Sequence, residues 1–227
     1  MKLLTCTLGV TMALACATTA LAQTASPFTA SLGAATDYRS KGLSKSADGG
    51  YVFATADWKS GALYAGVAAA TVDVPFGADY ETDLKAGIRP KLAGWDLDFG
   101  VFYRAFGDAN PGADDDYVEF RAQASRSWGP VNLRLLTWQT PDNAGAVEEA
   151  NWSEGRVTWR AARRVRASVS LGHHDQENGP TYAAWNAGVA LDVTPKVELD
   201  LRWYDTDAHA FGPRYEGEAV AALVTRF

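Results

Sequence analysis

Hydrophobic and polar residues alternate along most of the chain with a period of two, which predicts β-strands. Most of the alternating segments approach the roughly 9 to 11 residues with which a tilted strand crosses a bilayer. Their length and even number favour an all-β, transmembrane antiparallel up-and-down β-barrel of about 12 strands, with ten or fourteen as alternatives. The predicted strands are 28–38, 50–58, 62–71, 79–88, 95–104, 116–127, 131–139, 152–161, 165–173, 181–192, 197–204 and 215–227.

Short and long connections alternate between these segments. Outer-membrane barrels alternate short periplasmic turns with longer extracellular loops in the same way, so we expect both termini to be periplasmic. The short connections are Lys59–Gly61, Arg89–Gly94, Trp128–Pro130, Ala162–Arg164 and Val193–Lys196, and the longest of the others are 39–49, 105–115, 140–151 and 205–214.

The two faces of the predicted strands differ in character. In the fifth strand, Trp95, Leu97 and Phe99 alternate with charged Asp96 and Asp98. The apolar set should contact lipid. A soluble β-sandwich also alternates in this way, but charged inner faces opposite uniformly apolar outer faces favour a closed barrel with a polar interior.

The first 22 residues have the composition of a secretory signal peptide. Lys2 precedes an apolar stretch from Leu3 to about Ala15, and Ala20-Leu21-Ala22 forms a small-residue cleavage site. We expect residues 1–22 to be cleaved and residues 23–227 to form the barrel; lipidation at Cys16 is the alternative. Both cysteines then leave with the signal peptide, which excludes a disulfide or a cysteine metal site from the mature chain.

Charge argues against one class of partner and indicates a candidate site. Without Lys2 the chain keeps 20 basic and 27 acidic residues, a net charge near −7, which argues against nucleic acid as a partner. On the predicted inner face, five arginines form a basic wall: Arg121, Arg134, Arg156, Arg160 and Arg166. Acidic residues form an opposing wall: Glu81, Asp83, Asp96, Asp98, Glu198, Asp200, Glu216 and Glu218. Such walls bias the passage of ions and polar solutes; the alternative is that they pair across the lumen and plug it.

Candidate metal and catalytic residues are few. His173 and His174 are adjacent on one strand and point to opposite faces, so they do not readily share a metal ion. Ser170 and His173 are three positions apart on one strand and therefore also point to opposite faces. The sequence contains no convincing set of nucleophile, base and orienting group. We therefore predict no enzyme activity, no metal and no cofactor.

The segment Ala34–Ser46, with its T-x-Y-R-x-x-G-x-S pattern, resembles the start of the TorF-type porins of Gram-negative bacteria. Further resemblance to this family lies in 63–67, Val72-Asp73, 80–84 and the terminal Arg226-Phe227. Lys41 and Leu43 depart from that pattern. The resemblance implies an outer-membrane barrel, in which Phe227 would be the assembly signal, and supplies no catalytic or ligand residues.

The expected function is that of a porin, a passive and narrow channel for ions or small polar solutes. Its expected partners are outer-membrane lipid, lipopolysaccharide and the barrel assembly machinery. The alternative is a non-conducting structural or adhesive outer-membrane barrel whose lumen is plugged by charge pairs.

Overall fold

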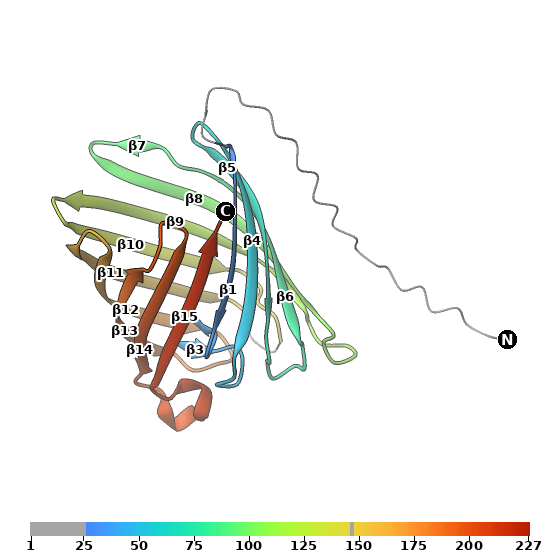
Figure 1. Ribbon diagram of the computed structural model, residues 1–227. Helices are drawn as coiled ribbons and strands as arrows, with labels where there is room; N and C mark the ends of the chain where they lie inside the picture. The colour runs from blue at the N-terminus through green and yellow to red at the C-terminus, as the bar shows by residue number, and fades with distance from the viewer. Residues whose placement is uncertain (1–25, 146–147) are drawn as a thin grey trace, which may run out of the picture.

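Twelve long antiparallel strands close into a barrel in the computed structural model, which describes residues 26–145 and 148–227 (Figure 1). The predicted signal peptide lies outside the described residues. The barrel strands are β1 (Phe28–Ala35), β4 (Tyr51–Ser60), β5 (Leu63–Thr71), β6 (Tyr80–Ile88), β8 (Trp95–Gly107), β9 (Asp116–Trp128), β10 (Val131–Thr140), β11 (Ala150–Ala162), β12 (Val165–Gln176), β13 (Tyr182–Asp192), β14 (Val197–Thr206) and β15 (Glu218–Arg226).

Each predicted strand corresponds to one of these, so the predicted fold is confirmed. The predicted bounds agree with the observed ones to within about three residues, and two of the differences arise because local structure intervenes. The first strand ends at Ala35, where the chain turns toward a small hairpin, rather than at residue 38. The last strand begins at Glu218, after two short 3-10 helices, η1 (His209–Phe211) and η2 (Pro213–Tyr215). Glu216, expected on that strand, therefore lies ahead of it.

Two pairings close the barrel. β1 pairs with β15, with Ser31 opposite Arg226, and β6 pairs with β8, with Ile88 opposite Phe99. Every barrel strand consequently has two neighbours. Backbone N–H and C=O groups find no water in hydrocarbon, so a closed sheet without a free edge is the β-structure that can span a bilayer. Within the described ranges, no helix is long and apolar enough to span a membrane.

Side chains alternate between the two surfaces of the wall as the sequence predicts. On β8, Phe99 and Val101 are 45% and 42% exposed on the outside, whereas Asp98 is 5% exposed on the inside. Where β8 begins, Trp95 and Trp128 pack edge to face, with their centroids 6.0 Å apart, and the Arg126 guanidinium lies against both rings. Aromatic rings of this kind anchor a barrel at the membrane interface.

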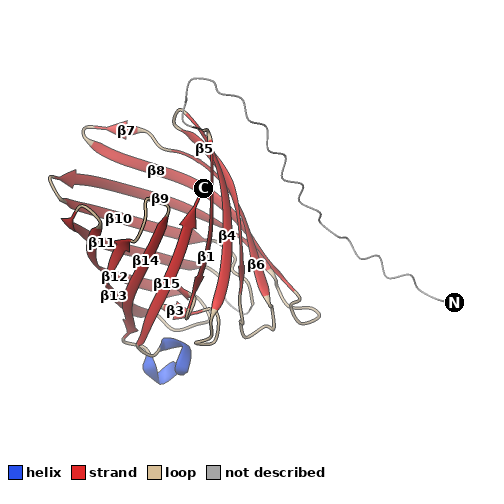
Figure 2. Cartoon of the chain, viewed as in Figure 1, coloured by secondary structure: helices blue, strands red, loops and turns tan. Residues whose placement is uncertain are grey.

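The two ends of the barrel are unlike (Figure 2). At one, here called the turn end, the connections are short, and both β7 (Lys91–Leu92) and the carboxyl terminus lie there. At the other, the loop end, are the long connections, including η1 and η2. The predicted alternation is confirmed, with one qualification: the turn at 89–94 is lengthened by β7, which pairs with β8.

Inside the barrel, a large ring covers a glycine. A Cβ at Gly172 would clash with the indole of Trp152, which is 4% exposed. The glycine is therefore required by the close approach of the ring.

We expect Gly172→Ala to lower the free energy of unfolding by about 1–3 kcal/mol, because the indole is forced from its position. Gly155→Ala is the matched control on the neighbouring strand, since its Cβ would meet Leu135 Cδ2 at an ordinary 3.7 Å. Urea unfolding of the protein in lipid vesicles measures both. Equal stability of the two variants would contradict this packing.

Candidate functional site: a hairpin across the lumen

A two-stranded hairpin folds into the barrel from the loop end. It consists of β2 (Arg39–Ser40) and β3 (Leu43–Ser44), with Ser40 paired to Leu43. The two residues between them, Lys41 and Gly42, have φ of 52° and 90°. Positive φ at both central positions is the signature of the type I′ turn, whose twist matches that of paired strands. Lysine is uncommon in this conformation, so other contacts are needed to hold Lys41 there.

The hairpin touches opposite sides of the barrel. On one side, the Lys45 ammonium pairs with Glu81 of β6. On the other, the Tyr182 hydroxyl of β13 donates to the Lys41 carbonyl at 2.9 Å, and a Cβ at Gly42 would clash with that of Ala184. Around the barrel, β6 and β13 are six strands apart in either direction. The hairpin therefore crosses the lumen along a diameter.

Simple geometry shows how much of the lumen this occupies. Twelve strands about 4.8 Å apart and tilted about 40° enclose a backbone-to-backbone diameter of roughly 24 Å. A sheet layer with its side chains is about 10 Å thick, so the gaps beside the hairpin are narrow and lined by side chains of the wall. A cavity of about 640 Å³ lies on the loop side of the hairpin, and one of about 90 Å³ on the turn side, against Arg156.

The ion pairs at the tip of the hairpin lie in a network centred on Arg104 of β8. This guanidinium donates to both carboxylate oxygens of Asp83, at 2.6 and 2.8 Å, and lies 3.8 Å from Glu81 and 4.0 Å from Glu119. The Lys41 ammonium pairs with the same Glu119. Three cations and three carboxylates thus balance in the part of the lumen that the hairpin crosses.

Burial changes the acid–base properties of the loop residues in this network. Burial, followed by the positive charge of Arg104, lowers the pKa of Lys45 from 10.5 to about 8, although Glu81 opposes the shift. Burial also lowers the pKa of Lys41, against the attraction of Glu119. It raises the pKa of Tyr38, whose hydroxyl donates to Glu81 at 2.5 Å, with the Glu81 charge as the next cause.

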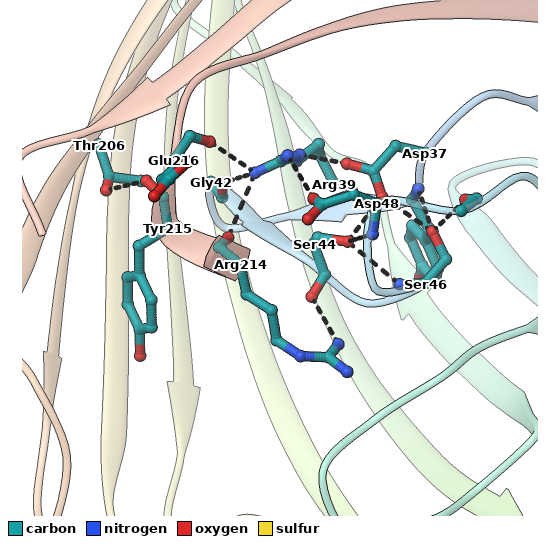
Figure 3. A network of polar contacts seen from close by, with 12 residues as sticks. Asp37, Arg39, Gly42, Ser44, Ser46, Asp48, Thr206, Arg214, Tyr215 and Glu216 are labelled. Carbon is teal, nitrogen blue, oxygen red and sulfur yellow. Dashed lines mark hydrogen bonds and ion pairs between the residues drawn. The ribbon is translucent and has the colours of Figure 1, made fainter. Parts of the chain in front are cut away.

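A second set of contacts joins the hairpin to the loop that precedes β15 (Figure 3). The Arg39 guanidinium pairs with Asp37 and Asp48 and donates to the carbonyls of Arg214, at 3.2 Å, and Glu216, at 3.1 Å. In the reverse direction, Arg214 donates to the Ser44 carbonyl at 3.3 Å. Only a planar guanidinium presents this many donors in a fixed fork, so Arg39 and Arg214 together lock the first and last long loops.

Between the hairpin and the turn end, several charged side chains share partners. Asp98 lies 2.8 Å from both Arg89 and Arg121, and Glu154 lies 2.6 Å from Arg134 and 3.3 Å from Arg156. In these two clusters each carboxylate faces two guanidinium groups, which leaves a surplus of positive charge. A third cluster is balanced, with Arg166 and Arg226 against Glu198 and Asp192.

The structure distributes the predicted wall residues as follows. Arg121, Arg134, Arg156 and Arg166 lie among the clusters just described, interleaved with carboxylates. Glu81, Asp83, Asp98 and Glu198 are likewise paired, and Asp200 pairs with Arg202 at 3.0 Å. Arg160 and Asp96 are exposed near the turn end, where Asp96 meets Lys91; Glu218 lies on β15 and Glu216 outside it. Phe227 is 68% exposed beyond β15.

The residues that reasoning from sequence missed are of two kinds. Arg104, Glu119 and Glu154 lie an even number of positions from other inward-facing residues of their strands. This alternation is a signal that could have identified them. Lys41 and Lys45 are in a loop whose path depends on tertiary contacts. Of the histidines considered, His173 is exposed and His174 is 4% exposed. Within residues 26–145 and 148–227, no cluster of three metal-ligating side chains occurs.

Comparison with solved structures shows that this fold resembles the barrels of porins and of an outer membrane channel. The KdgM porin superposes with a TM-score of 0.62 at 5% identity, covering 88% of this chain and 98% of its own. An outer membrane channel from Pseudomonas putida F1 superposes with a TM-score of 0.59 at 13% identity, covering 89% of this chain and 96% of its own. The NanC porin superposes with a TM-score of 0.55 at 11% identity, covering 87% of this chain and 98% of its own. KdgM has also been solved in complex with disordered oligogalacturonate.

The chain belongs to the Gcw_chp family, described as bacterial proteins of unknown function, whose model matches residues 20–223. No curated protein matches the chain. The family found is thus not named for TorF-type porins, and that resemblance stays an expectation from the sequence.

We predict that replacing Arg39 releases the two locked loops while the barrel stays intact. In Arg39→Lys, amide hydrogen exchange in residues 39–48 and 207–217 should accelerate about tenfold or more, because charge-assisted hydrogen bonds worth about 1.5–3 kcal/mol are lost.

Exchange in the barrel strands should not change. Arg126→Lys, at the turn end, is the control and should leave both loops protected. Unchanged exchange of the loops in Arg39→Lys would show that Arg39 does not hold them.

Proposed function

We propose that the protein is a narrow, passive channel of the bacterial outer membrane for ions or small polar solutes, with a preference for anions. The observation that carries the proposal is the surplus of guanidinium groups around Asp98 and Glu154. The side chains of Arg89, Arg134 and Arg156 are 41%, 31% and 25% exposed. A passing anion can approach guanidinium groups of this kind, as it approaches charged rings in pores.

The proposed orientation follows from the two ends of the barrel. The short turns and both termini face the periplasm, and the loop end faces outside, as in other outer-membrane barrels. Outward apolar residues then contact outer-membrane lipid and lipopolysaccharide. Phe227, exposed just beyond β15, is the assembly signal that the barrel assembly machinery reads. The proposal includes no catalytic step and no cofactor.

The hairpin is the constriction of this channel. It lies across a full diameter and is held on both sides, so solutes pass through gaps lined by the wall. This supports passage of small solutes and disfavours bulky ones. The fold of KdgM, solved with disordered oligogalacturonate, is a precedent for a polar solute in a barrel of this shape.

A second candidate is a non-conducting structural or adhesive barrel. The same hairpin and the pairing of most of the predicted lumen charges favour it, because together they could plug the lumen. Single-channel current through planar bilayers separates the two candidates. Stable stepwise openings support the channel, and a folded protein that carries no current supports the plugged barrel.

We expect Arg134→Gln combined with Arg156→Gln to reverse the ion preference. The two substitutions leave Glu154 as the charge of that cluster. Two charges about 4 Å apart in water interact by about 1 kcal/mol, so the anion-to-cation permeability ratio should fall about fivefold. The reversal potential in a salt gradient measures it.

The matched control removes one cation and one anion together, as Glu198→Gln with Arg226→Gln, from the balanced cluster. Its permeability ratio should stay at the wild-type value. If the arginine variant keeps its anion preference as well, the surplus charge does not line the conducting path.

We also predict that selectivity depends on pH through Lys45. Its pKa of about 8 means that Lys45 is mostly charged at pH 7 and mostly neutral at pH 9. Loss of this positive charge at the constriction should shift the reversal potential toward cation preference between those pH values. Lys45→Gln should abolish the shift.

Lys91→Gln is the control for this experiment, because Lys91 lies at the turn end with its side chain 83% exposed. It should keep the wild-type pH dependence. A shift that persists in Lys45→Gln would assign the titration to another group.

A further inference from the structure

The larger cavity, on the loop side of the hairpin, is deep. Phe211 is 61% exposed at its rim, whereas Tyr182 and His174 are 2% and 4% exposed at its base. Its volume of about 640 Å³ falls in the range of pockets that hold ligands of drug size, roughly 300–1,000 Å³. The cavity lies ahead of the constriction, so a solute entering from the loop end meets it first.

Aromatic rings line the cavity from two separate parts of the chain. Phe76 and Phe106 meet edge to face, with centroids 5.0 Å apart, next to β9. Tyr215 of η2 meets Tyr182 edge to face at 5.5 Å and lies 5.9 Å from Phe211. Such rings offer faces on which a flat or ring-shaped ligand stacks. Phe211 is free to do so, because most of its surface is exposed to solvent.

The charges around the cavity are arranged unequally. Its lining contains four basic side chains, Lys41, Lys45, Arg104 and Arg214, and one acidic side chain, Asp48. The carboxylates that pair with the two lysines, Glu119 and Glu81, are not part of the lining, and their side chains are only 3% exposed. The side chains of Lys41 and Lys45 are 16% and 14% exposed. Each pair is therefore a dipole whose positive end is nearer the cavity.

A buried imidazole adds a polar group at the base. The His174 ring lies 5.0 Å from that of Tyr182 and 6.1 Å from that of Trp152. Among the residues that the structure describes, its Nδ1 has no hydrogen-bond partner. A buried polar atom without a partner is unfavourable, so a ligand or water that reaches this base gains a hydrogen bond there.

We propose that this cavity binds small ring-bearing carboxylates, the chemistry shared by aromatic acids and sugar acids, through ring stacking on Phe211 and Tyr215 and attraction to Lys41 and Lys45. Binding itself is a property of the cavity. The further suggestion that the cavity captures solutes before they pass through the channel rests on the proposed function.

Equilibrium dialysis of the purified full protein in detergent tests the proposal. The probes are benzoate and glucuronate, the uncharged ring amides benzamide and glucuronamide, and the ringless carboxylate succinate. One of the two ring carboxylates should bind about tenfold more tightly than its own amide and than succinate, since attraction and stacking each contribute on this scale. Which acid binds identifies the source of the ligand.

Two variants separate the contributions of charge and stacking. Phe211→Ala should weaken the ring carboxylate about tenfold, and Phe28→Ala, a similarly exposed phenylalanine at the turn end, should have no effect. Lys45→Gln combined with Glu81→Gln removes one dipole without changing net charge and should reduce the preference for the acid over the amide. Glu81 is replaced too so that no unpaired carboxylate is left buried.

Equal affinity for acid and amide, or full affinity in Phe211→Ala, would overturn the proposal. So would the absence of saturable binding by both ring carboxylates. Current measurements on the same preparations distinguish the two proposals. Binding without current would refute the channel and leave the site standing, whereas current without binding would refute the site alone.

Discussion

The rest of this structure depends on the need to pair every backbone N–H and C=O group within the sheet. Pairing of β1 with β15 and of β6 with β8 satisfies the last two edges, and closure then creates an interior that twelve strands line with every second residue. Outside, the alternate residues are apolar. Inside, they are charged or polar, and a charge kept from bulk water needs a partner. The ion-pair clusters of the lumen are thus a consequence of closure.

Those clusters differ along the barrel axis in a way that bears on function. Where the hairpin crosses, Lys41, Lys45 and Arg104 are balanced by carboxylates of β6 and β9. Nearer the turn end, Asp98 and Glu154 each serve two arginines. In the balanced region every charge has a partner, and the hairpin is held from both sides of the barrel. The unbalanced region retains donors for a mobile ion, which is why we assign ion preference to it.

Much of the fold could be predicted from sequence because a period of two is a local property. It indicates which residues form strands and which face each residue takes, and Asp98 and Arg121, predicted on the same face, pair with each other in the structure. The pairing of charged side chains could not be predicted in this way. Lys45 and Glu81 are 36 positions apart, and their pairing depends on the path of a loop. The turn at Lys41-Gly42 also lacks the Asn-Gly or Asp-Gly dipeptide that signals a type I′ hairpin. Glu216 was misplaced because η2 interrupts the alternation before β15.

The hairpin has a mechanical consequence for the wall. A closed sheet resists stretching along its hydrogen bonds. Its cross-section can become oval more easily, because each of the twelve boundaries between strands needs to bend only slightly. A rigid strut between β6 and β13 removes that freedom along one diameter. In a bilayer, lateral pressure along this axis would act on the Lys45–Glu81 and Tyr182–Lys41 contacts. A change in the cross-section of the barrel along this diameter therefore requires a change in the contacts of the hairpin, and the reverse also holds.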